Sequence, residues 1–189
     1  MKHHKVFLIS ALVLMLTIQA CSPNTVAANP PVDTPVITPT AATPPETSPE
    51  TSQNNPAQAG TEVHADDMKF VVTGTVRPAD GIVSSGDMFN AQAGEYRQYV
   101  FVTLDVTCET TPDQQCHLSL FKMRLLGSDG ILKYPESFIS GVESIFKNTD
   151  FQGGTTISGD VPFIISVGAS RLLLIYESLS GDSSYLALP

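Results

Sequence analysis

Apolar and polar residues alternate most regularly between residues 96 and 107. One side of this segment is aliphatic: Val100, Val102, Leu104 and Val106. The other side is polar: Thr103, Asp105 and Thr107. A period of two is typical of a β-strand with one face on a core and one face in water. We therefore predict a strand here.

Six further segments are rich in β-branched, aromatic and other apolar residues and are bounded by turn-forming residues. They are residues 68–76, 118–126, 131–134, 157–167, 170–178 and 185–188. In the second of them the apolar phase shifts between Leu120 and Phe121, which predicts a bulge or twist within one strand. About seven short strands with turns between them indicate an all-β fold, either a sandwich or a barrel.

One segment departs from the strand pattern. Ser140 and Glu143 have the spacing of a helix capping box, and Val142, Ile145 and Phe146 recur at helical intervals. We expect either a helix of one or two turns or a crossover loop at this place.

The connection between the first two predicted strands is long and irregular, over residues 78–94. Connections of this length in compact domains are usually functional or disordered. Met88 and Phe89 are apolar residues within it and form the candidate binding loop. They either close the end of the core or contact a partner.

Residues 1–20 have the pattern of a secretory signal peptide. Lys2 and Lys5 precede an apolar run over residues 6–18. A helix of thirteen residues covers about 20 Å, which is short of the roughly 30 Å hydrocarbon core of a bilayer. A permanent transmembrane helix is therefore the weaker interpretation.

The apolar run ends in Ile18-Gln19-Ala20-Cys21, which resembles the bacterial lipobox. That resemblance implies that Cys21 is diacylated and becomes the N-terminus after cleavage. A plain secretory peptide cut near Ala20 is the alternative. Two or three acyl chains anchor a protein stably, so a lipidated Cys21 would hold the chain on a membrane.

A stalk follows the candidate lipidated cysteine. Residues 22–62 contain nine prolines and eight threonines, and no Lys, Arg, aromatic or Leu residue. This composition cannot build a core and favours a disordered, semi-rigid spacer. The predicted organisation is a lipoprotein signal peptide (1–20), a lipidated cysteine with a disordered Pro/Thr-rich stalk (21–62) and one folded domain (63–189).

Four segments of the folded part resemble a known family. They are residues 99–106 (YVFVTLDV), 121–130 (FKMRLLGSDG), 159–163 (GDVPF) and 172–176 (LLLIY). They are similar to the telokin-like, immunoglobulin-like family of extracellular domains of unknown function in bacterial surface lipoproteins. The resemblance implies an immunoglobulin-like antiparallel β-sandwich of about seven strands, and it implies little about function.

The charge pattern limits the class of partner. Ten Lys and Arg residues against nineteen Asp and Glu residues give a net charge of −9, and Trp is absent. A nucleic-acid partner requires a clustered basic face, whereas the basic residues here are scattered. We therefore expect no nucleic-acid partner, and the acidic charge favours a monomer.

Cys108 and Cys116 remain if Cys21 carries lipid. Seven mostly polar residues separate them, and we expect them at facing strand ends. In an oxidising compartment a disulfide between them would stabilise the fold by about 2.5 kcal/mol. The alternative is a redox-active or metal-binding pair, although the Cys-x-x-Cys spacing of such pairs is missing.

The sequence contains no known catalytic or cofactor-binding motif. His64 lies beside two aspartates and could hold a weak metal site, or it is a solvated lead-in to a strand. His117 could pair with Ser119 and Asp105 as a catalytic group, or it is an exposed loop histidine. We expect no enzymatic activity, no cofactor and no bound metal.

Three functions are consistent with these features. The leading hypothesis is a lipid-anchored extracytoplasmic protein of the cell membrane, whose β-sandwich is a non-catalytic binding module for a protein or envelope partner. The first alternative is a structural or accessory envelope lipoprotein in a fixed complex. The second is a cryptic hydrolase, which requires a histidine within hydrogen-bond reach of a Ser hydroxyl or a metal in a pocket.

Overall fold

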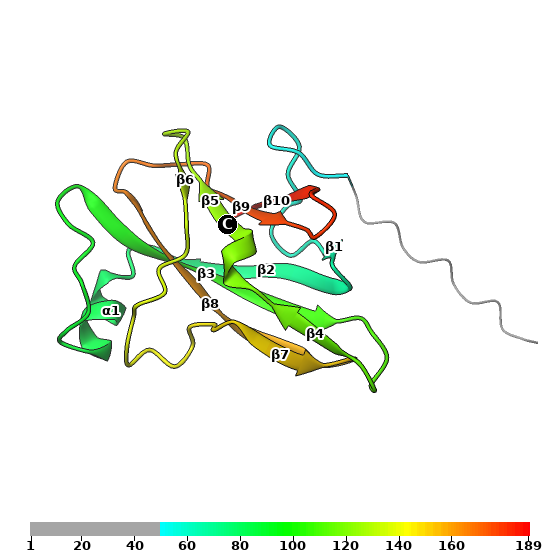
Figure 1. The fold of residues 1–189 in the computed structure, drawn as a ribbon. Helices are drawn as coiled ribbons and strands as arrows, with labels where there is room; N and C mark the ends of the chain where they lie inside the picture. Colours follow the sequence, from blue (N-terminus) through cyan, green and yellow to red (C-terminus); the bar gives the residue numbers. More distant parts are fainter. Residues whose placement is uncertain (1–49) are drawn as a thin grey trace, which may run out of the picture. The chain divides into compact units, whose positions relative to one another are not determined.

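The structure, a computed structural model, describes residues 50–189 (Figure 1). The signal peptide, Cys21 and the stalk up to residue 49 lie outside the described residues. The described part holds ten strands, one α-helix and one short 3-10 helix. All paired strands of its sheets are antiparallel.

The first sheet has the order β1-β2-β3-β8. Its strands are β1 (Val63–Ala65), β2 (Met68–Val76), β3 (Arg97–Cys108) and β8 (Thr156–Ser166). β3 pairs with β8 along almost its whole length, from Arg97 opposite Ser166 to Thr107 opposite Thr156. The β3–β8 pairing therefore runs through the domain from one end to the other.

The second sheet has the order β10-β9-β5-β6, and a third sheet pairs β4 with β7. The strands of the second sheet are β5 (Met123–Leu126), β6 (Leu132–Lys133), β9 (Leu173–Glu177) and β10 (Ser183–Ala187). Those of the third are β4 (Gln115–Leu118) and β7 (Thr149–Gln152). The predicted all-β sandwich is confirmed, with ten strands in place of about seven.

The main core lies between the sheets and includes the alternating apolar residues of the strand predicted over residues 96–107. The aliphatic side of β3 (Val100, Val102, Leu104 and Val106) is fully buried. It belongs to one cluster with buried residues of the second sheet, Leu125, Leu174, Tyr176 and Leu186. Burial of this apolar surface supplies the main favourable contribution to folding.

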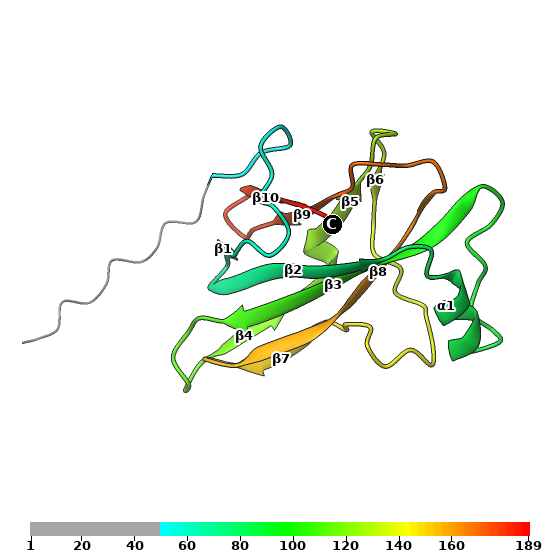
Figure 2. The same cartoon turned by 180° about the vertical axis from the view of Figure 1, so that it is seen from behind.

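The N-terminal half of β3 is buried on both faces. Tyr99 and Phe101 alternate with the core residues and point to the opposite side, where they form a second cluster with Ala79, Val83 and Ala93. Val83 belongs to α1 (Asp80–Gly86), which lies beside this end of β3 in Figure 2. α1 therefore covers a sheet face that would otherwise expose two aromatic side chains.

The prediction of one bulged strand over residues 118–126 is wrong. The chain runs as β4 in one sheet, turns through the 3-10 helix η1 (Leu120–Lys122) and continues as β5 in another sheet. The side chain of Asn148 accepts a hydrogen bond from the N–H of Leu120 at 2.8 Å and holds this turn. The phase shift at Leu120 thus marks a change of sheet.

The helix expected from the capping-box spacing is absent, and the crossover-loop interpretation of residues 140–146 is the right one. Within it Ile145 forms an isolated bridge with Asp160 of β8. Pairing with the edge of β8 replaces the helical hydrogen bonds that the sequence pattern favours. The observed helix, α1, lies instead in residues 78–94, which were expected to be irregular.

Ordered contacts begin before residue 63, the expected start of the domain. Ala57 is buried, and its N–H donates to the carbonyl of Tyr185 at 2.8 Å. Its own carbonyl accepts from Ala187 at 2.7 Å, so this segment covers the edge of β10. Residues 50–62, assigned to the stalk from composition, therefore pack on the sandwich, on the side away from α1 (Figures 1 and 2).

Candidate functional site

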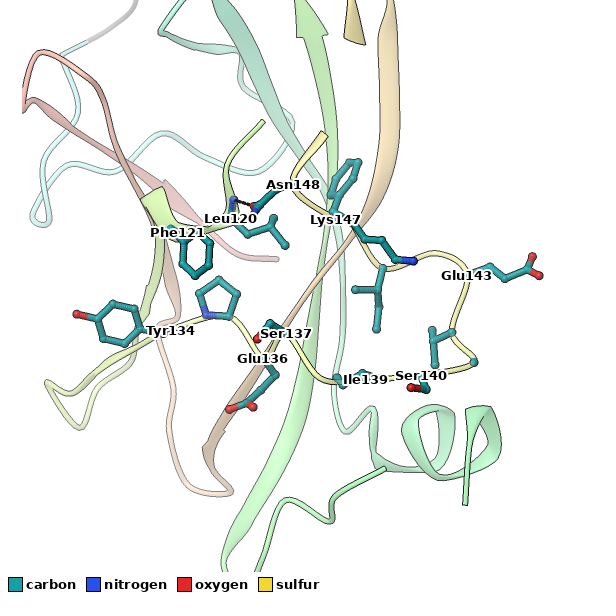
Figure 3. Close-up of a pocket in the computed structure, with 15 residues that line it drawn as sticks. Leu120, Phe121, Tyr134, Glu136, Ser137, Ile139, Ser140, Glu143, Lys147 and Asn148 are labelled. Carbon is teal, nitrogen blue, oxygen red and sulfur yellow. Dashed lines mark hydrogen bonds between the residues drawn. The ribbon is translucent and has the colours of Figure 1, made fainter. Parts of the chain in front are cut away.

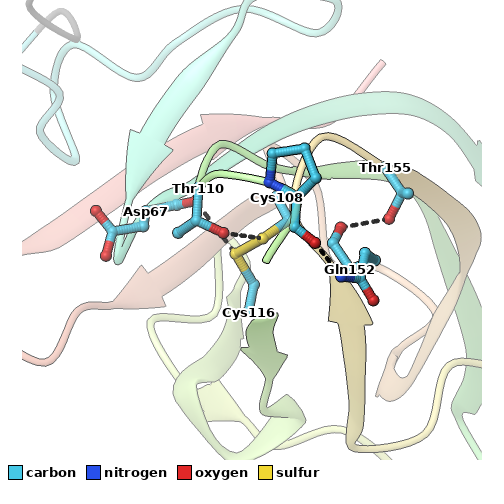
Figure 4. The surroundings of a disulfide bond; sticks show 7 residues. Asp67, Cys108, Thr110, Cys116, Gln152 and Thr155 are labelled. Atoms are coloured by element: carbon cyan, nitrogen blue, oxygen red, sulfur yellow. Dashed lines mark hydrogen bonds between the residues drawn. A yellow bond between two sulfur atoms is a disulfide. The ribbon is translucent and has the colours of Figure 1, made fainter. Parts of the chain in front are cut away.

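Cys108 and Cys116 are joined by a disulfide, with their Cα atoms 5.6 Å apart (Figure 4). The loop that it closes is held by the β7–β8 turn: Gly154 donates to the carbonyl of Cys108 at 2.8 Å, and Gly153 donates to that of Gln114 at 3.0 Å. A Cβ at Gly153 would stand 2.1 Å from the carbonyl oxygen of Thr111. Only a glycine permits this approach. The loop between Cys108 and Cys116 is therefore held in one position by the disulfide and by the β7–β8 turn.

A charged cluster lies beneath the β1–β2 turn. The Asp66 carboxylate accepts from Lys122 Nζ at 2.7 Å, from the Tyr176 hydroxyl at 2.9 Å and from the N–H of Leu179 at 2.8 Å. Its side chain is only 9% exposed. These contacts connect three elements that are distant in sequence.

The electrostatics of this cluster favour the ionised carboxylate. Burial raises the pKa of Asp66, but the hydrogen bonds from Lys122, Leu179 and Tyr176 and the charge of Lys122 outweigh burial and hold the pKa below its usual range. Burial and the hydrogen bond to Asp66 raise the pKa of the Tyr176 phenol. The cluster is therefore an ionised Asp66 paired with Lys122, with a neutral Tyr176 phenol hydrogen-bonded to the carboxylate. Its role is to hold the β1–β2 turn, η1 and the end of β9 together.

The two histidines of the domain do not form the groupings considered from sequence. His64 Nδ1 lies 2.8 Å from Glu109, while the neighbouring Asp66 turns to Lys122. His117 Nδ1 lies 2.6 Å from Asp150. Within residues 50–189, no group of three or more His, Cys, Asp or Glu side chains is placed to hold a metal ion.

Asp105, one of the two partners considered for His117, accepts a hydrogen bond from the Ser158 hydroxyl at 2.5 Å. His117 is bonded to Asp150 of the facing strand β7, with which it is in register. His117 and Asp105 are therefore each hydrogen-bonded to another residue.

Met88 and Phe89 are exposed, by 85% and 88%, so they do not close the end of the core. α1 and Ala93 close it instead. Phe138 in another loop is 92% exposed. We refer to Met88, Phe89 and Phe138 as the loop patch.

Asn90 connects the two loops that carry this patch. Its side-chain amide donates to the carbonyl of Ser140 at 2.9 Å, and its side-chain oxygen accepts from the Ser140 N–H at 2.8 Å. A third hydrogen bond runs from Asn90 to the carbonyl of Val83 in α1, at 2.7 Å. The three patch residues all lie within two positions of Asn90 or Ser140, so they belong to one end of the domain.

A cavity of about 600 Å³ lies next to this end, between η1 and residues 134–148 (Figure 3). Its surface is predominantly apolar, with buried Leu120 and Phe146 and partly exposed Ile139, Val142 and Ile145. Figure 3 shows residues 134–148 curving around it, with Phe121 and Tyr134 on one side. We refer to it as the crossover cavity.

The aromatic side of the crossover cavity is fixed by Arg124. The guanidinium of Arg124 lies over the ring of Tyr134, 4.2 Å from its centroid. The same group donates to the carbonyls of Phe121 and Met123 and pairs with Glu177 at 3.3 Å. Two largely exposed aromatic residues are thus held in place, which is what a preformed binding wall requires.

The sequence analysis missed this cavity. Its residues come from one segment that was interpreted as a helix or crossover and from a turn that was interpreted as part of a strand. The available signal was the run of apolar residues at Ile139, Val142 and Ile145, which lies between strands but has no strand period.

No helix in the described part of the chain is long and apolar enough to cross a membrane.

No family model matches the chain, and no curated protein shows significant similarity to it. Among solved structures, the chain is similar to yjhA of Bacillus subtilis, with 11% identity and a TM-score of 0.49 over 70% of this chain and 99% of that protein. It is also similar to MPT63, a secreted protein of Mycobacterium tuberculosis, with 12% identity and a TM-score of 0.47 over 70% of this chain and 96% of that protein.

A third similar structure is ycdA of Bacillus subtilis, described as a candidate lipoprotein. It is 12% identical, with a TM-score of 0.50 over 69% of this chain, and the chain spans 38% of the length of ycdA. At this level of identity the likeness concerns the fold alone. The comparisons thus show that the chain has a β-sandwich fold similar to that of these bacterial proteins, and they identify no family.

Proposed function

We propose that this chain is a lipid-anchored extracytoplasmic protein whose β-sandwich is a non-catalytic binding module. The proposed location is supported by the lipobox-like sequence ending in Cys21 and by the disulfide, because disulfides persist in oxidising compartments. The similar bacterial structures include a secreted protein and a candidate lipoprotein, which agrees with this location.

One observation carries the binding role: the loop patch and the crossover cavity gather apolar surface at one end of the domain. Large apolar side chains exposed at one end of a domain, beside an apolar cavity, are typical of a surface that contacts a partner. Residues 50–62 lie on the other side of the domain from α1 (Figure 1). A domain tethered through residue 50 can therefore present the patch away from its attachment point.

Cross-linking and mass spectrometry on intact cells test this proposal. Cells expressing the wild-type chain should show acyl mass on Cys21, retention in the membrane and cross-links to a partner. The Cys21→Ala variant should lose the acyl mass and the retention. A wild-type product that is free of acyl mass and released into the medium would refute the anchor.

The binding role is tested with a matched pair of patch variants. Met88→Ser with Phe89→Ser should remove the cross-linked partner, because it replaces two exposed apolar side chains of the loop patch. Leu179→Ser is the control, since Leu179 is 82% exposed but adjoins the Asp66 cluster. Equal loss in both variants would contradict the role of the patch. A partner bound in fixed stoichiometry in both would indicate the structural-lipoprotein alternative.

A further inference from the structure

We propose that the crossover cavity binds one small, uncharged and mainly apolar molecule. This inference rests on the proposed binding function and names the ligand class of its site. It is supported by the fixed position of the segment around the cavity, and by the volume and charge of the cavity.

The segment around the cavity is irregular but fixed at several points. The N–H of Glu136 donates to the carbonyl of Pro162 at 2.8 Å, and that of Phe146 donates to the carbonyl of Asp160 at 2.9 Å. The middle of the segment is bonded to Asn90 through Ser140. Both ends and the middle are therefore tied to the sandwich, so the protein's own contacts hold the walls of the cavity in place. Preformed sites bind with a smaller entropic cost.

The size of the cavity favours a small molecule as its occupant. A volume of about 600 Å³ falls within the range of roughly 300–1,000 Å³ that is usual for small-molecule sites. It corresponds to the liquid volume of about twenty water molecules, at roughly 30 Å³ each. The cavity thus accommodates a two- or three-ring molecule or a medium-length aliphatic chain.

The chemistry of the walls favours an uncharged ligand. The charged side chains at the rim are of both signs, Glu136 and Glu143 against Lys147. In Figure 3 the carboxylate of Glu143 points away from the cavity, so these charges do not converge on one point. Because charges of both signs lie at the rim, a charged ligand that meets an opposite charge also meets a like charge, so the loss of its hydration is not offset, which is costly. The Ser137 hydroxyl remains as a polar group at the rim for one hydrogen bond.

Two probes that share an anilinonaphthalene ring system test this inference. N-phenyl-1-naphthylamine is neutral, and 8-anilinonaphthalene-1-sulfonate carries a sulfonate. Each is titrated by fluorescence into a chain from Ser22 to Pro189, which lacks acyl groups but retains the stalk and both hydrophobic clusters. We expect one site per chain for the neutral probe and at least about tenfold weaker binding of the sulfonate, a difference of about 1.4 kcal/mol.

Three variants locate the site. Ser137→Trp puts an indole into the cavity and should weaken binding of the neutral probe by about tenfold or more. Tyr134→Ala removes one wall and should weaken it by about fivefold, roughly 1 kcal/mol. Leu179→Ala is the control, because Leu179 is 82% exposed and does not line the cavity; the change should stay within about twofold.

The outcomes separate this inference from the proposed function. Absence of probe binding, equal or tighter binding of the sulfonate, or equal loss in Ser137→Trp and Leu179→Ala would overturn the inference. Any of these results leaves the anchoring and the cross-linked partner as they are, because neither measurement uses the cavity.

Discussion

At the Cys108 end of the sandwich, a disulfide and a partly buried ion pair fix the loops, whereas at the α1 end the loops are connected through the amide of Asn90. The contacts of the Cys108 end join β3 to β4, and the β1–β2 turn to η1 and β9. Those of the α1 end join one loop to another loop and to a short helix. The exposed apolar side chains of the loop patch lie at the second end.

At both ends, a glycine allows two backbone segments to approach each other closely. Gly153 approaches Thr111 at the Cys108 end, and Gly141 approaches Gly86 at the α1 end, where an added Cβ would stand 2.0 Å from a carbonyl oxygen. Gly141 also has φ of 71°, which favours glycine. Close approach alone therefore does not distinguish the two ends; covalent and ionic contacts do. The following variants weaken these contacts in order of expected effect.

Removal of the disulfide should have the largest effect. The double variant Cys108→Ala with Cys116→Ala should lower the free energy of unfolding by about 2.5 kcal/mol, because the unfolded chain regains the entropy of the closed loop. Urea unfolding followed by circular dichroism measures this change. A reducing agent should destabilise the wild type and leave the variant unchanged. A loss equal to or below that of Asn90→Ala would contradict the contrast between the two ends.

Asp66→Asn should have the next largest effect. It leaves the partly buried Lys122 ammonium, whose side chain is 23% exposed, without its charge partner, so we expect a loss of about 2 kcal/mol at pH 7. Asn tolerates the left-handed backbone that Asp66 adopts at φ of 53°, so strain does not contribute. Asp67→Asn is the matched control, because Asp67 is exposed and has φ of 59°. Equal losses of unfolding free energy in the two variants would show that the Asp66–Lys122 ion pair does not stabilise the fold.

The same cluster predicts a dependence on pH. The pKa of Asp66 is lower in the folded state than in the unfolded state, so the unfolded state takes up a proton first as the pH falls. The stabilisation is present above the unfolded pKa, about 3.9, and disappears as the pH falls through the lower folded pKa. The difference in stability between wild type and Asp66→Asn should therefore shrink below about pH 4.

The sequence predicted those parts of the fold in which neighbouring residues carry the information. Strand β3 follows from a period of two along twelve residues, and its buried face agrees with the prediction. The change of sheet at Leu120 did not follow, because it depends on Asn148, which is distant in sequence. The shift in the apolar pattern at Leu120 was visible in the sequence. Its interpretation as a change of sheet requires the contact with Asn148, which local patterns do not identify.

The candidate site was predicted only in part for the same reason. Met88 and Phe89 were noticed because they are apolar residues outside any strand pattern, and the structure exposes them. The crossover cavity was missed because it forms between two segments brought together by the sheets. Asn90 had no sequence signal at all, since its role depends on the carbonyl and N–H of Ser140, fifty residues further along the chain, as well as on the carbonyl of Val83 in α1.

Asn90→Ala tests the α1 end directly. The variant loses three hydrogen bonds at a partly buried position, and we expect a loss of about 1.5 kcal/mol, since water replaces some of them. Amide hydrogen exchange should become faster in α1 and in residues 134–148 and stay unchanged near Cys108. Gln92→Ala, at an exposed neighbouring position, is the control. Uniform acceleration over the whole domain would show that the α1 end does not open separately.

His117→Ala should have the smallest effect, although it lies at the strongly fixed Cys108 end. His117 and Asp150 are 2.6 Å apart, but their side chains are 62% and 63% exposed, and water screens their interaction. Exposed pairs of this kind contribute little, so we expect a change of less than about 0.5 kcal/mol in urea unfolding. His64→Ala is the comparison, because the His64 side chain is 25% exposed and should matter more.

The same variant decides between a binding module and a hydrolase. If the Cys108 end were an active site, His117 would act as its base, and replacing it would abolish turnover of ester or peptide substrates while leaving stability intact. A binding module predicts that wild type and His117→Ala show the same background rate. The disulfide and the Asp66 cluster hold the Cys108 end in place without His117. A loss of turnover in His117→Ala would therefore come from lost catalysis, and it would identify the Cys108 end as an active site.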